Sequence, residues 1–577
     1  MSNMTIQKWA SAVLALSLSA AVITGCSSAN VKPNATEAPQ PSPTEAAAEE
    51  SESPAEADPF GKYDSPVQLK MARLVDTTFK FKPGESIDNN DWNKLFLDRL
   101  GIDLKYAWTA NQQQYPQKMN VTIASGDIPD LMQVWGPQVS QLADADSLAD
   151  LTEAYEKYAS PRLKELMNLD GGIALNTAKR DGKLYAIPEP ASTVPNTMLF
   201  IRKDWLDKLG LDEPKTLQDV FAISEAFATQ DPDGNGKKDT YGIGLQKDFS
   251  KNKVPFGIEG LASGFHAYLD TWIQDGKGGL TQSTILPEMR DVLLQLQEMY
   301  KGGQIDKEFG VKDSSKVNQD VVAGRIGMFY GPQWSPALPL KDSWANDKAD
   351  WRSYGVVSID DKPALLPVKP NGQNYFVVKK GYPNPEAAIK LANLFADISL
   401  NVTEENFNKY MKSSIDDGNG GKSVIEVFKY APIRLQNHEA VFENMKLIND
   451  AVKSGDPSQL GVGDNLASYE RLKKWETDKT DPNAWQDWAL LGEGGTYSVQ
   501  EMYVRENRKI NDEYWGPTTE TMSKKQSTLD KKKEEVFTSI VLGAPIEEFD
   551  KFVSDWKALG GDEISKEVND WYATIKQ

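Results

Sequence analysis

Val67-Gln-Leu-Lys-Met-Ala-Arg-Leu-Val75 is the first predicted strand of an alternation that decides the fold class. A helix is predicted over 91–100, with Asn90 or Asp91 as its cap and with apolar residues repeating on one face. A second strand is predicted over 101–108, directly after that helix. Strands that alternate with helices of this length indicate an α/β fold built on a parallel sheet.

The alternation continues through a helix over 115–124 and the turn Ser125-Gly-Asp-Ile-Pro-Asp130 into the strand Leu131-Met-Gln-Val-Trp135. Ligands of open α/β sheets collect beyond the carboxyl ends of the strands. Trp135, at the tip of its strand, is therefore expected beside a cleft.

The amino-terminal 61 residues have the composition of a signal followed by a tether. Residues 1–25 hold a short apolar run that is typical of a secretory signal, and Ile23-Thr-Gly-Cys26 resembles a bacterial lipobox. That resemblance implies cleavage before Cys26 and lipidation of its thiol. Because Cys26 is the only cysteine, no internal disulfide forms. Residues 26–61 are rich in Ala, Glu, Pro and Ser, which predicts a lipid-anchored, disordered tether.

Charge and composition exclude several function classes. The formal net charge of −20 argues against nucleic acid and anionic membranes as partners. With two histidines, the chain has almost no material for histidine metal catalysis or a His-based triad. A G-x-S-x-G elbow and a Walker loop are absent from the sequence. Acidic residues are plentiful, but no pair is marked out as the facing carboxylates of a glycoside hydrolase.

Asp231-Pro-Asp-Gly-Asn-Gly-Lys-Lys-Asp239 matches the first nine positions of an EF-hand-type calcium loop, in which oxygens recur at every second residue. Gly242 stands at the twelfth position, where an EF-hand has its bidentate Glu, so a structural rather than a sensory calcium (Ca2+) is expected. The alternative is a solvated Asx-rich turn without metal. The expected ligands, with Lys237 serving through its carbonyl oxygen, are Asp231, Asp233, Asn235, Lys237, Asp239 and Thr240.

A series of segments in this order resembles the bacterial extracellular solute-binding proteins, the lipoprotein receptors of carbohydrate ABC importers. The segments are Ser125–Asp130, Asp181–Pro188, Leu199–Gly210, Val321–Trp334 and Tyr382–Phe395. The chain length and the calcium loop are similar to the large subgroup that includes alginate-oligosaccharide binders. The resemblance implies a monomeric, non-enzymatic receptor, anchored on the extracellular face of the membrane of a Gram-positive bacterium. It would capture an oligosaccharide by hinge closure and deliver it to a permease.

The resemblance also implies a periplasmic-binding-protein-like fold of two α/β lobes joined by hinge strands. The expected N-terminal lobe comprises 62–197 and 366–433, and the C-terminal lobe comprises 198–365 and 434–577. The first crossing between them is expected within 185–200, which holds three prolines and has no helical period. Residues 401–521 show the least clear sequence pattern of the whole chain.

Ligand contacts are expected from aromatic faces and a few polar groups, because sugar rings present apolar faces and hydroxyls. Trp334 is the foremost candidate, since Gly331 and Pro332 place it in a loop after a strand. A position in the core is the alternative for each aromatic candidate. The expected ligand-binding residues are Trp334, Trp135, Trp272, Tyr375 and Asp130.

Other residues are expected to be structural. Trp92, Trp205 and Trp556 occupy apolar helical positions and are predicted core residues. Arg202, beside Asp204, is expected in a salt bridge. Three rival functions remain for the chain: a glycoside hydrolase, a receptor for peptides or other solutes, and a surface adhesin.

Overall fold

This computed structural model describes residues within 57–575, which form one compact unit. The described residues are 57–575 except 76–78, 112–113, 191–193, 253, 370–373, 401–402, 417–421, 436–437, 462 and 493. The predicted signal, the lipidated Cys26 and most of the predicted tether lie outside them. Within the described part of the chain, no helix is long and apolar enough to cross a membrane.

The first sheet has five strands in the order β2-β1-β3-β14-β6. Strands β1, β2 and β3 are parallel, and β14 runs antiparallel to both of its neighbours. This confirms the alternating α/β pattern read from residues 67–135. The strands are β1 Val67–Leu74, β2 Ile102–Ala110, β3 Leu131–Val134, β6 Ala186–Pro188 and β14 Tyr375–Val378.

Helix α1 (Asp91–Leu100) shows how the first core is assembled. The Asn90 side chain accepts hydrogen bonds from two backbone N–H groups of the first turn, which is the capping role predicted for it. The buried Trp92 stacks on Phe395 of α13 with the ring centroids 5.5 Å apart. Helix α1 is thereby fixed against a helix some 300 positions later in the chain. The other helices of this region are α2 Tyr115–Ser125, α3 Gly136–Asp144, α4 Thr152–Tyr158, α5 Pro161–Met167, α6 Ile173–Thr177 and α13 Glu386–Leu400.

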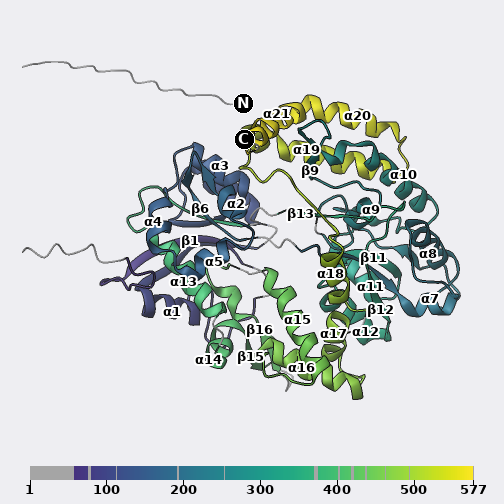
Figure 1. Cartoon of the computed structure of the whole chain (residues 1–577), viewed down its shortest axis with the longest axis horizontal. Helices are drawn as coiled ribbons and strands as arrows, with labels where there is room; N and C mark the ends of the chain where they lie inside the picture. Colours follow the sequence, from purple (N-terminus) through teal and green to yellow (C-terminus); the bar gives the residue numbers. More distant parts are fainter. Residues whose placement is uncertain are drawn as a thin grey trace, which may run out of the picture. The chain divides into compact units, whose positions relative to one another are not determined.

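The second sheet has the order β12-β7-β11-β8. Strand β11 is antiparallel to β7 and parallel to β8. Its strands are β7 Thr197–Arg202, β8 Tyr241–Ile243, β11 Ile326–Pro332 and β12 Trp351–Tyr354. The helices packed in its core include α7 Lys203–Leu209, α8 Leu217–Thr229, α9 Glu259–Gly264, α10 Pro287–Lys301, α11 Ser314–Val322, α12 Lys341–Asp347, α19 Glu520–Val541, α20 Glu547–Trp556 and α21 Asp562–Ile575 (Figure 1).

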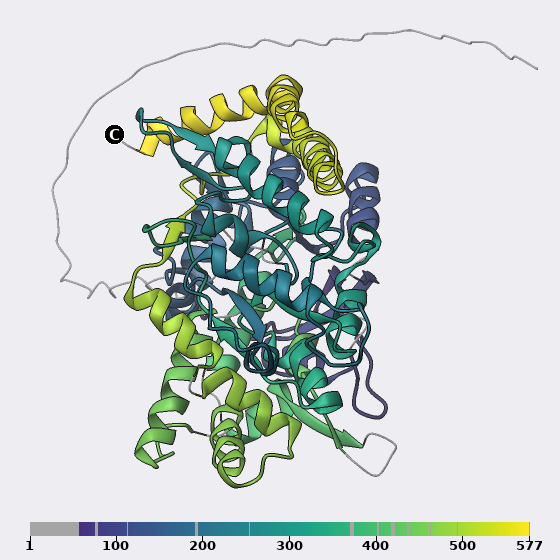
Figure 2. The same ribbon diagram turned by 90° about the vertical axis from the view of Figure 1, so that its right-hand side faces the viewer.

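Residues of 401–521, which carried no clear sequence pattern, form mainly a helical cluster. Helices α15 (His438–Ser454), α16 (Asp464–Thr477), α17 (Pro482–Leu491) and α18 (Thr496–Arg505) pack on one another around a buried cluster of their own (green to yellow-green in Figure 2). The cluster is attached to the second sheet: the Ser353 hydroxyl on β12 donates to the carbonyl of Gly494 over 2.8 Å.

Short strand pairs complete the described structure. Strands β13 (Leu366–Val368) and β17 (Lys509–Asn511) are parallel, and β9 (Trp272–Gln274) and β10 (Leu280–Gln282) form a hairpin. The remaining strands are β4 Lys179–Arg180, β5 Lys183–Leu184, β15 Ser413–Asp416 and β16 Lys422–Ile425.

Two large buried clusters divide the chain. One draws on residues between Leu69 and Ile187 and again between Tyr375 and Leu435. The other draws on residues between Met198 and Leu366 and again beyond Trp475. The chain therefore changes core after β6, again between β13 and β14, and a third time between Leu435 and Trp475. The lobe boundaries expected from the resemblance stay a prediction.

Candidate functional site

Trp135 and Tyr375 lie at one edge of the first sheet. Tyr375 begins β14 and pairs with Val134 at the end of β3, so both aromatic residues stand where β3 ends. Trp135 is the N-terminal cap residue of α3, half-buried, with its ring edge-to-face on Tyr115 at a centroid distance of 5.9 Å. The Tyr375 hydroxyl is buried 2.6 Å from the Thr177 hydroxyl oxygen. Trp135 is thus the more accessible of the two rings.

A polar chain at the same edge was not recognised from the sequence. The Gln133 amide donates to Oδ1 of Asn374 over 3.0 Å, and the Asn374 amide donates to Oε2 of Glu189 over 2.7 Å. The Glu189 backbone N–H closes the ring by donating to the Asn374 carbonyl. Glu189 is buried and stands between two prolines directly after β6. These contacts join the exit from β6 to the entry into β14.

Asp130 does not reach this edge. It precedes β3, so it lies at the amino end of the strand whose carboxyl end carries Trp135. Its carboxylate accepts the backbone N–H of Lys70 over 2.8 Å, and its carbonyl accepts that of Lys379. Its polar atoms hold neighbouring strands together, and a ligand contact from Asp130 stays a prediction.

Trp334 lies beyond the carboxyl end of β11, where Pro332 pairs with Thr197 at the start of β7. The Ser335 backbone N–H and hydroxyl both donate to the Pro332 carbonyl, which closes a tight turn with Trp334 inside it. A side chain at Gly331 would meet Phe329 at 2.8 Å and the Ser335 hydroxyl at 2.9 Å, so the turn requires glycine. The indole is 42% exposed, which is high for a tryptophan.

The crossing between β6 and β7 is fixed at its second end by the helical cluster. The Tyr503 hydroxyl on α18 donates to the Thr197 carbonyl over 3.0 Å and accepts the N–H of Val356 over 2.9 Å. The Thr197 hydroxyl donates to the buried carboxylate of Glu259 at 2.5 Å. Hydrogen bonds therefore hold the segment between the two cores at both of its ends, at Glu189 and at Thr197.

Trp272 is 5% exposed and lies in the core, edge-on to Tyr514 at a centroid distance of 6.5 Å. Its backbone N–H donates to the carboxylate of Asp512, whose other oxygen lies 3.2 Å from the Lys369 ammonium. Burial raises the pKa of the Asp512 carboxyl above its ordinary value. Burial acts to lower the pKa of Lys369, but the negative charges of Asp512 and Asp270 outweigh it and raise the pKa.

The predicted calcium loop brings its acidic side chains together. The Asn235 amide nitrogen donates to Oδ2 of Asp233 over 2.6 Å and to Oδ1 of Asp239 over 3.1 Å. The Asp231 carboxylate accepts the N–H groups of Asn235 and Gly236. Burial, a hydrogen bond with Asp231 and the negative charges of Asp239 and Asp231 raise the pKa of Asp233. Crowded carboxylates of this kind favour a cation in their midst.

Packing against helix α8 determines the surroundings of the expected ligand Thr240 and of Gly242, the position that departs from the EF-hand pattern. The Thr240 hydroxyl is buried and donates to the Phe227 carbonyl over 2.8 Å, so its proton is committed to the helix. A side chain at Gly242 would collide with Ser224 at 2.1 Å, which excludes the twelfth-position glutamate of an EF-hand. Lys237 presents its N–H to Oδ1 of Asn235.

The loop carries the hard oxygen donors that calcium prefers, three carboxylates and an amide. Across the described part of the chain, no group of three or more His, Cys, Asp or Glu side chains is placed closely enough to hold a metal ion. In the loop, the Asn235 amide nitrogen lies between the Asp233 and Asp239 carboxylates.

Residues 96–413, more than half of the chain, match the family model of the bacterial extracellular solute-binding proteins. The chain belongs to this family. This solute-binding protein is 25% identical to lipoprotein LipO of Bacillus subtilis over 508 residues. The aligned region covers 86% of this chain and 91% of LipO. It is 22% identical over 470 residues to the polygalacturonan/rhamnogalacturonan-binding protein YtcQ of the same organism, covering 80% and 83% of the two chains.

The similarity extends to solved structures. The alginate-binding protein AlgQ2, solved without calcium ion, superposes with a TM-score of 0.61 at 16% identity over 89% of this solute-binding protein and 99% of AlgQ2. An EF-hand mutant of the substrate-binding protein FusA from S. pneumoniae, in complex with fructo-nystose, gives a TM-score of 0.61 at 16% identity over 88% and 99%. These likenesses confirm the fold class predicted from the sequence.

Proposed function

We propose that this solute-binding protein captures an oligosaccharide between two lobes and delivers it to the permease of an ABC importer. The observation that carries the proposal is the exposed indole of Trp334, held by a tight turn at the end of β11, where Pro332 pairs with Thr197 at the start of β7. An exposed, fixed indole is suited to stacking on the apolar face of a sugar ring. The named ligands of YtcQ and FusA support the same class of solute.

The other candidate residues have two proposed roles: some contact the sugar, and others hold the surroundings of the site in place. Trp135, half-buried at the edge of the first sheet, is proposed as the stacking partner contributed by the first lobe. Tyr375 and Trp272 are buried and already have partners, so they are proposed to fix the surroundings of the site rather than to cover the sugar. Glu189 and Asn374 offer polar groups at the same edge.

Capture is proposed to proceed by hinge closure. A ligand that contacts both lobes binds the closed state more tightly than the open state and shifts the population toward it by that difference in affinity. The hydrogen bonds at 195–197 and the ion pair of Lys369 with Asp512 hold the ends of the crossing segments, which limits the motion to the residues between them.

A structural calcium ion is proposed for the loop, held by Asp231, Asp233, Asn235 and Asp239 and by the Lys237 carbonyl. Thr240 is a weaker ligand candidate because its hydroxyl proton is directed to α8. The bound ion supplies positive charge among crowded carboxylates and contributes to the stability of the second core. It makes no proposed contact with the sugar.

The chain is proposed to be a monomeric lipoprotein, anchored at Cys26 on the extracellular face of the membrane and without catalytic activity. The lipobox-like residues and the name of LipO support the anchor, and FusA is named a substrate-binding protein.

A thermal-shift screen tests the function. The whole chain is heated with a panel of neutral and uronic-acid oligosaccharides in the presence of calcium. A ligand about 100-fold above its Kd adds about 2.7 kcal/mol to the native state. A raised melting temperature with one sugar class, and recovery of that sugar intact, supports a receptor. Cleavage of the sugar would indicate a hydrolase, and no shift across the panel would contradict the proposal.

A further inference from the structure

The helical cluster lines a pocket of about 500 Å³. None of the residues at the sheet edges described above contributes to it. Its lining residues come from all four helices, α15 to α18, and from the turns that follow α16 and α17. They recur at spacings of three and four: Asn449, Val452 and Lys453 on α15, and Leu472, Trp475 and Glu476 on α16. On α16 this is the face buried in the cluster, and on α15 it flanks the buried face of Met445, Ile448 and Ala451. The volume falls in the range of small-ligand sites.

The pocket has an apolar floor and a charged rim. Leu472, Trp475 and Leu491 are buried, whereas Lys453 and Glu501 at the rim are exposed. The other charged residues of the lining, also exposed, are Glu476 and Lys479. Two lysines and two glutamates leave the lining without net charge. The rim as a whole attracts neither sign of ligand charge at a distance, and a neutral ligand with many hydroxyls finds both donors and acceptors there.

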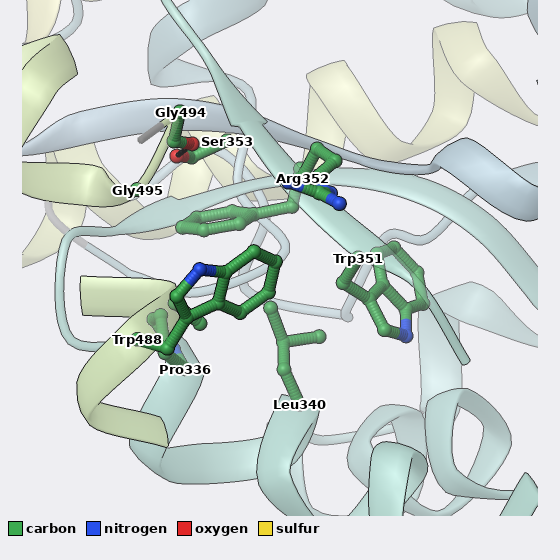
Figure 3. Close-up of a pocket in the computed structure, with 10 residues that line it drawn as sticks. Pro336, Leu340, Trp351, Arg352, Ser353, Trp488, Gly494 and Gly495 are labelled. Atoms are coloured by element: carbon green, nitrogen blue, oxygen red, sulfur yellow. Dashed lines mark hydrogen bonds between the residues drawn. The ribbon is translucent and has the colours of Figure 1, made fainter. Parts of the chain in front are cut away.

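The aromatic part of the lining is held in place before any ligand arrives. Trp488 lies 5.9 Å from Trp475 between ring centroids, and the guanidinium of Arg352 on β12 lies 4.5 Å over the Trp488 ring. Figure 3 shows the Trp488 indole from the sheet side, close to Leu340 and Pro336. An indole fixed in this way loses little conformational freedom when a ring stacks on it.

Helix α18 separates the pocket from the crossing segment. Ser498 and Glu501 line the pocket, while Gln500 and Tyr503 donate hydrogen bonds to the carbonyls of Pro195 and Thr197. At about 100° per residue, the first pair and the second pair lie on opposite faces of the helix. The pocket is therefore a separate site, divided from the crossing by one helix.

We propose that this pocket is a second, accessory saccharide-binding site that takes a neutral sugar ring on its indole floor. The proposal rests on the proposed function only in the class of ligand, because its residues are distinct from those at the sheet edges. Stacking on the partly exposed ring of Trp488 supplies the apolar contact, while the buried Trp475, with the Lys479 ammonium over its ring, packs against Trp488. The rim carboxylates of Glu476 and Glu501 accept hydrogen bonds from the hydroxyls.

The test places one reporter at each site. In a Cys26→Ser background the chain has no other cysteine, so Lys453→Cys at the pocket rim and Gln333→Cys beside Trp334 each give a unique position for a trifluoromethyl label. Each labelled whole chain is titrated with kestose, maltotriose and galactotriose while the 19F shift is followed. We expect the label at 453 to titrate saturably. Glu501→Gln should weaken that titration about tenfold, because a charged hydrogen-bond acceptor is lost.

Glu470→Gln, an exposed change on α16 outside the pocket, is the control and should leave both titrations unchanged. A label at 453 that stays silent with all three sugars at millimolar concentration overturns the accessory site, whatever the label at 333 reports. A silent label at 333 with a titrating label at 453 instead counts against the proposed function. Equal affinities at 453 with and without Glu501→Gln would also contradict the assignment.

Discussion

The ammonium nitrogen of Lys369 lies 3.2 Å from Oδ2 of Asp512, one residue beyond the ends of two parallel strands that pair Val368 with Asn511. The Asp512 backbone N–H donates to the Val368 carbonyl, so both main chain and side chains hold the two segments together. Leu366 belongs to the second core and Tyr375 to the first. The ion pair therefore anchors the chain at a point where it leaves one core for the other.

Asp512→Asn should lower the free energy of unfolding by about 3 kcal/mol, because the partly buried ammonium loses its counter-charge. Urea unfolding of the variant measures this. The double variant Lys369→Met/Asp512→Asn should be less destabilised than the sum of its single changes. The exposed pair Lys380–Asp146 is the control, and its disruption should cost less than about 1 kcal/mol. Equal losses of unfolding free energy at the two ion pairs would contradict an anchoring role for Lys369 and Asp512.

The same pair predicts a pH dependence. The pKa of Lys369 is raised above its ordinary value of 10.5, so its contribution to stability is complete below 10.5 and is lost as the pH rises through the raised value. Stability of the wild type should fall relative to Lys369→Met over that range. Parallel curves for the two proteins would show that the ammonium makes no such contribution.

Arg73→Met should destabilise the first core. The buried guanidinium donates to the carbonyls of Tyr430 and Ala431 over 2.8 and 2.6 Å, and to that of Lys429 over 2.9 Å. Each buried acceptor left without a donor costs about 1–3 kcal/mol, so a loss of at least about 3 kcal/mol is expected in urea unfolding. Arg99→Met, at an exposed position on α1, is the control and should change stability by less than about 0.5 kcal/mol.

Trp334→Ala should raise the Kd for the captured sugar about tenfold, because the stacking face is removed while the turn is kept by Ser335. Calorimetric titration gives the Kd. Leu338→Ala changes another exposed apolar residue that follows in the same segment and should leave the Kd within about twofold. Similar effects of the two substitutions would argue against stacking at Trp334.

Removal of calcium by a chelator should lower the melting temperature. For an ion present at about 100-fold above its Kd, the free energy of unfolding should fall by about 2.7 kcal/mol. Asp233→Asn should reproduce most of this loss and abolish the response to the chelator. Asp275→Asn is the matched control, because Asp275 also accepts backbone N–H groups in a turn but without crowding by other carboxylates. A melting temperature unchanged by the chelator would remove the calcium assignment.

The sequence predicted the regular parts of the fold well, because local signals and tertiary packing agree there. Helix α1 begins after the predicted cap Asn90, and Trp92, Trp205 and Trp556 are buried as expected. Arg202 forms the predicted ion pair with Asp204 at 2.6 Å. In each case a short-range pattern in the sequence indicates the cap, the buried side chain or the ion pair.

The rest depends on contacts between distant residues. Gln133, Glu189 and Asn374 meet because three strands are neighbours in the sheet, and no local pattern marks all three. Helix α16 buries few large side chains, among them Leu472 and Trp475, so its apolar period is weak. The helical cluster and its pocket could therefore not be read from residues 401–521.

A calorimetric titration of the whole chain with the oligosaccharide class selected by thermal shift tests the central claim most directly, with the sugar analysed by mass spectrometry afterwards. The account predicts saturable binding that Trp334→Ala weakens about tenfold, and recovery of the sugar at its original length. Binding that Trp334→Ala leaves unchanged, or recovery of shortened products, would contradict capture and delivery as the function of this protein.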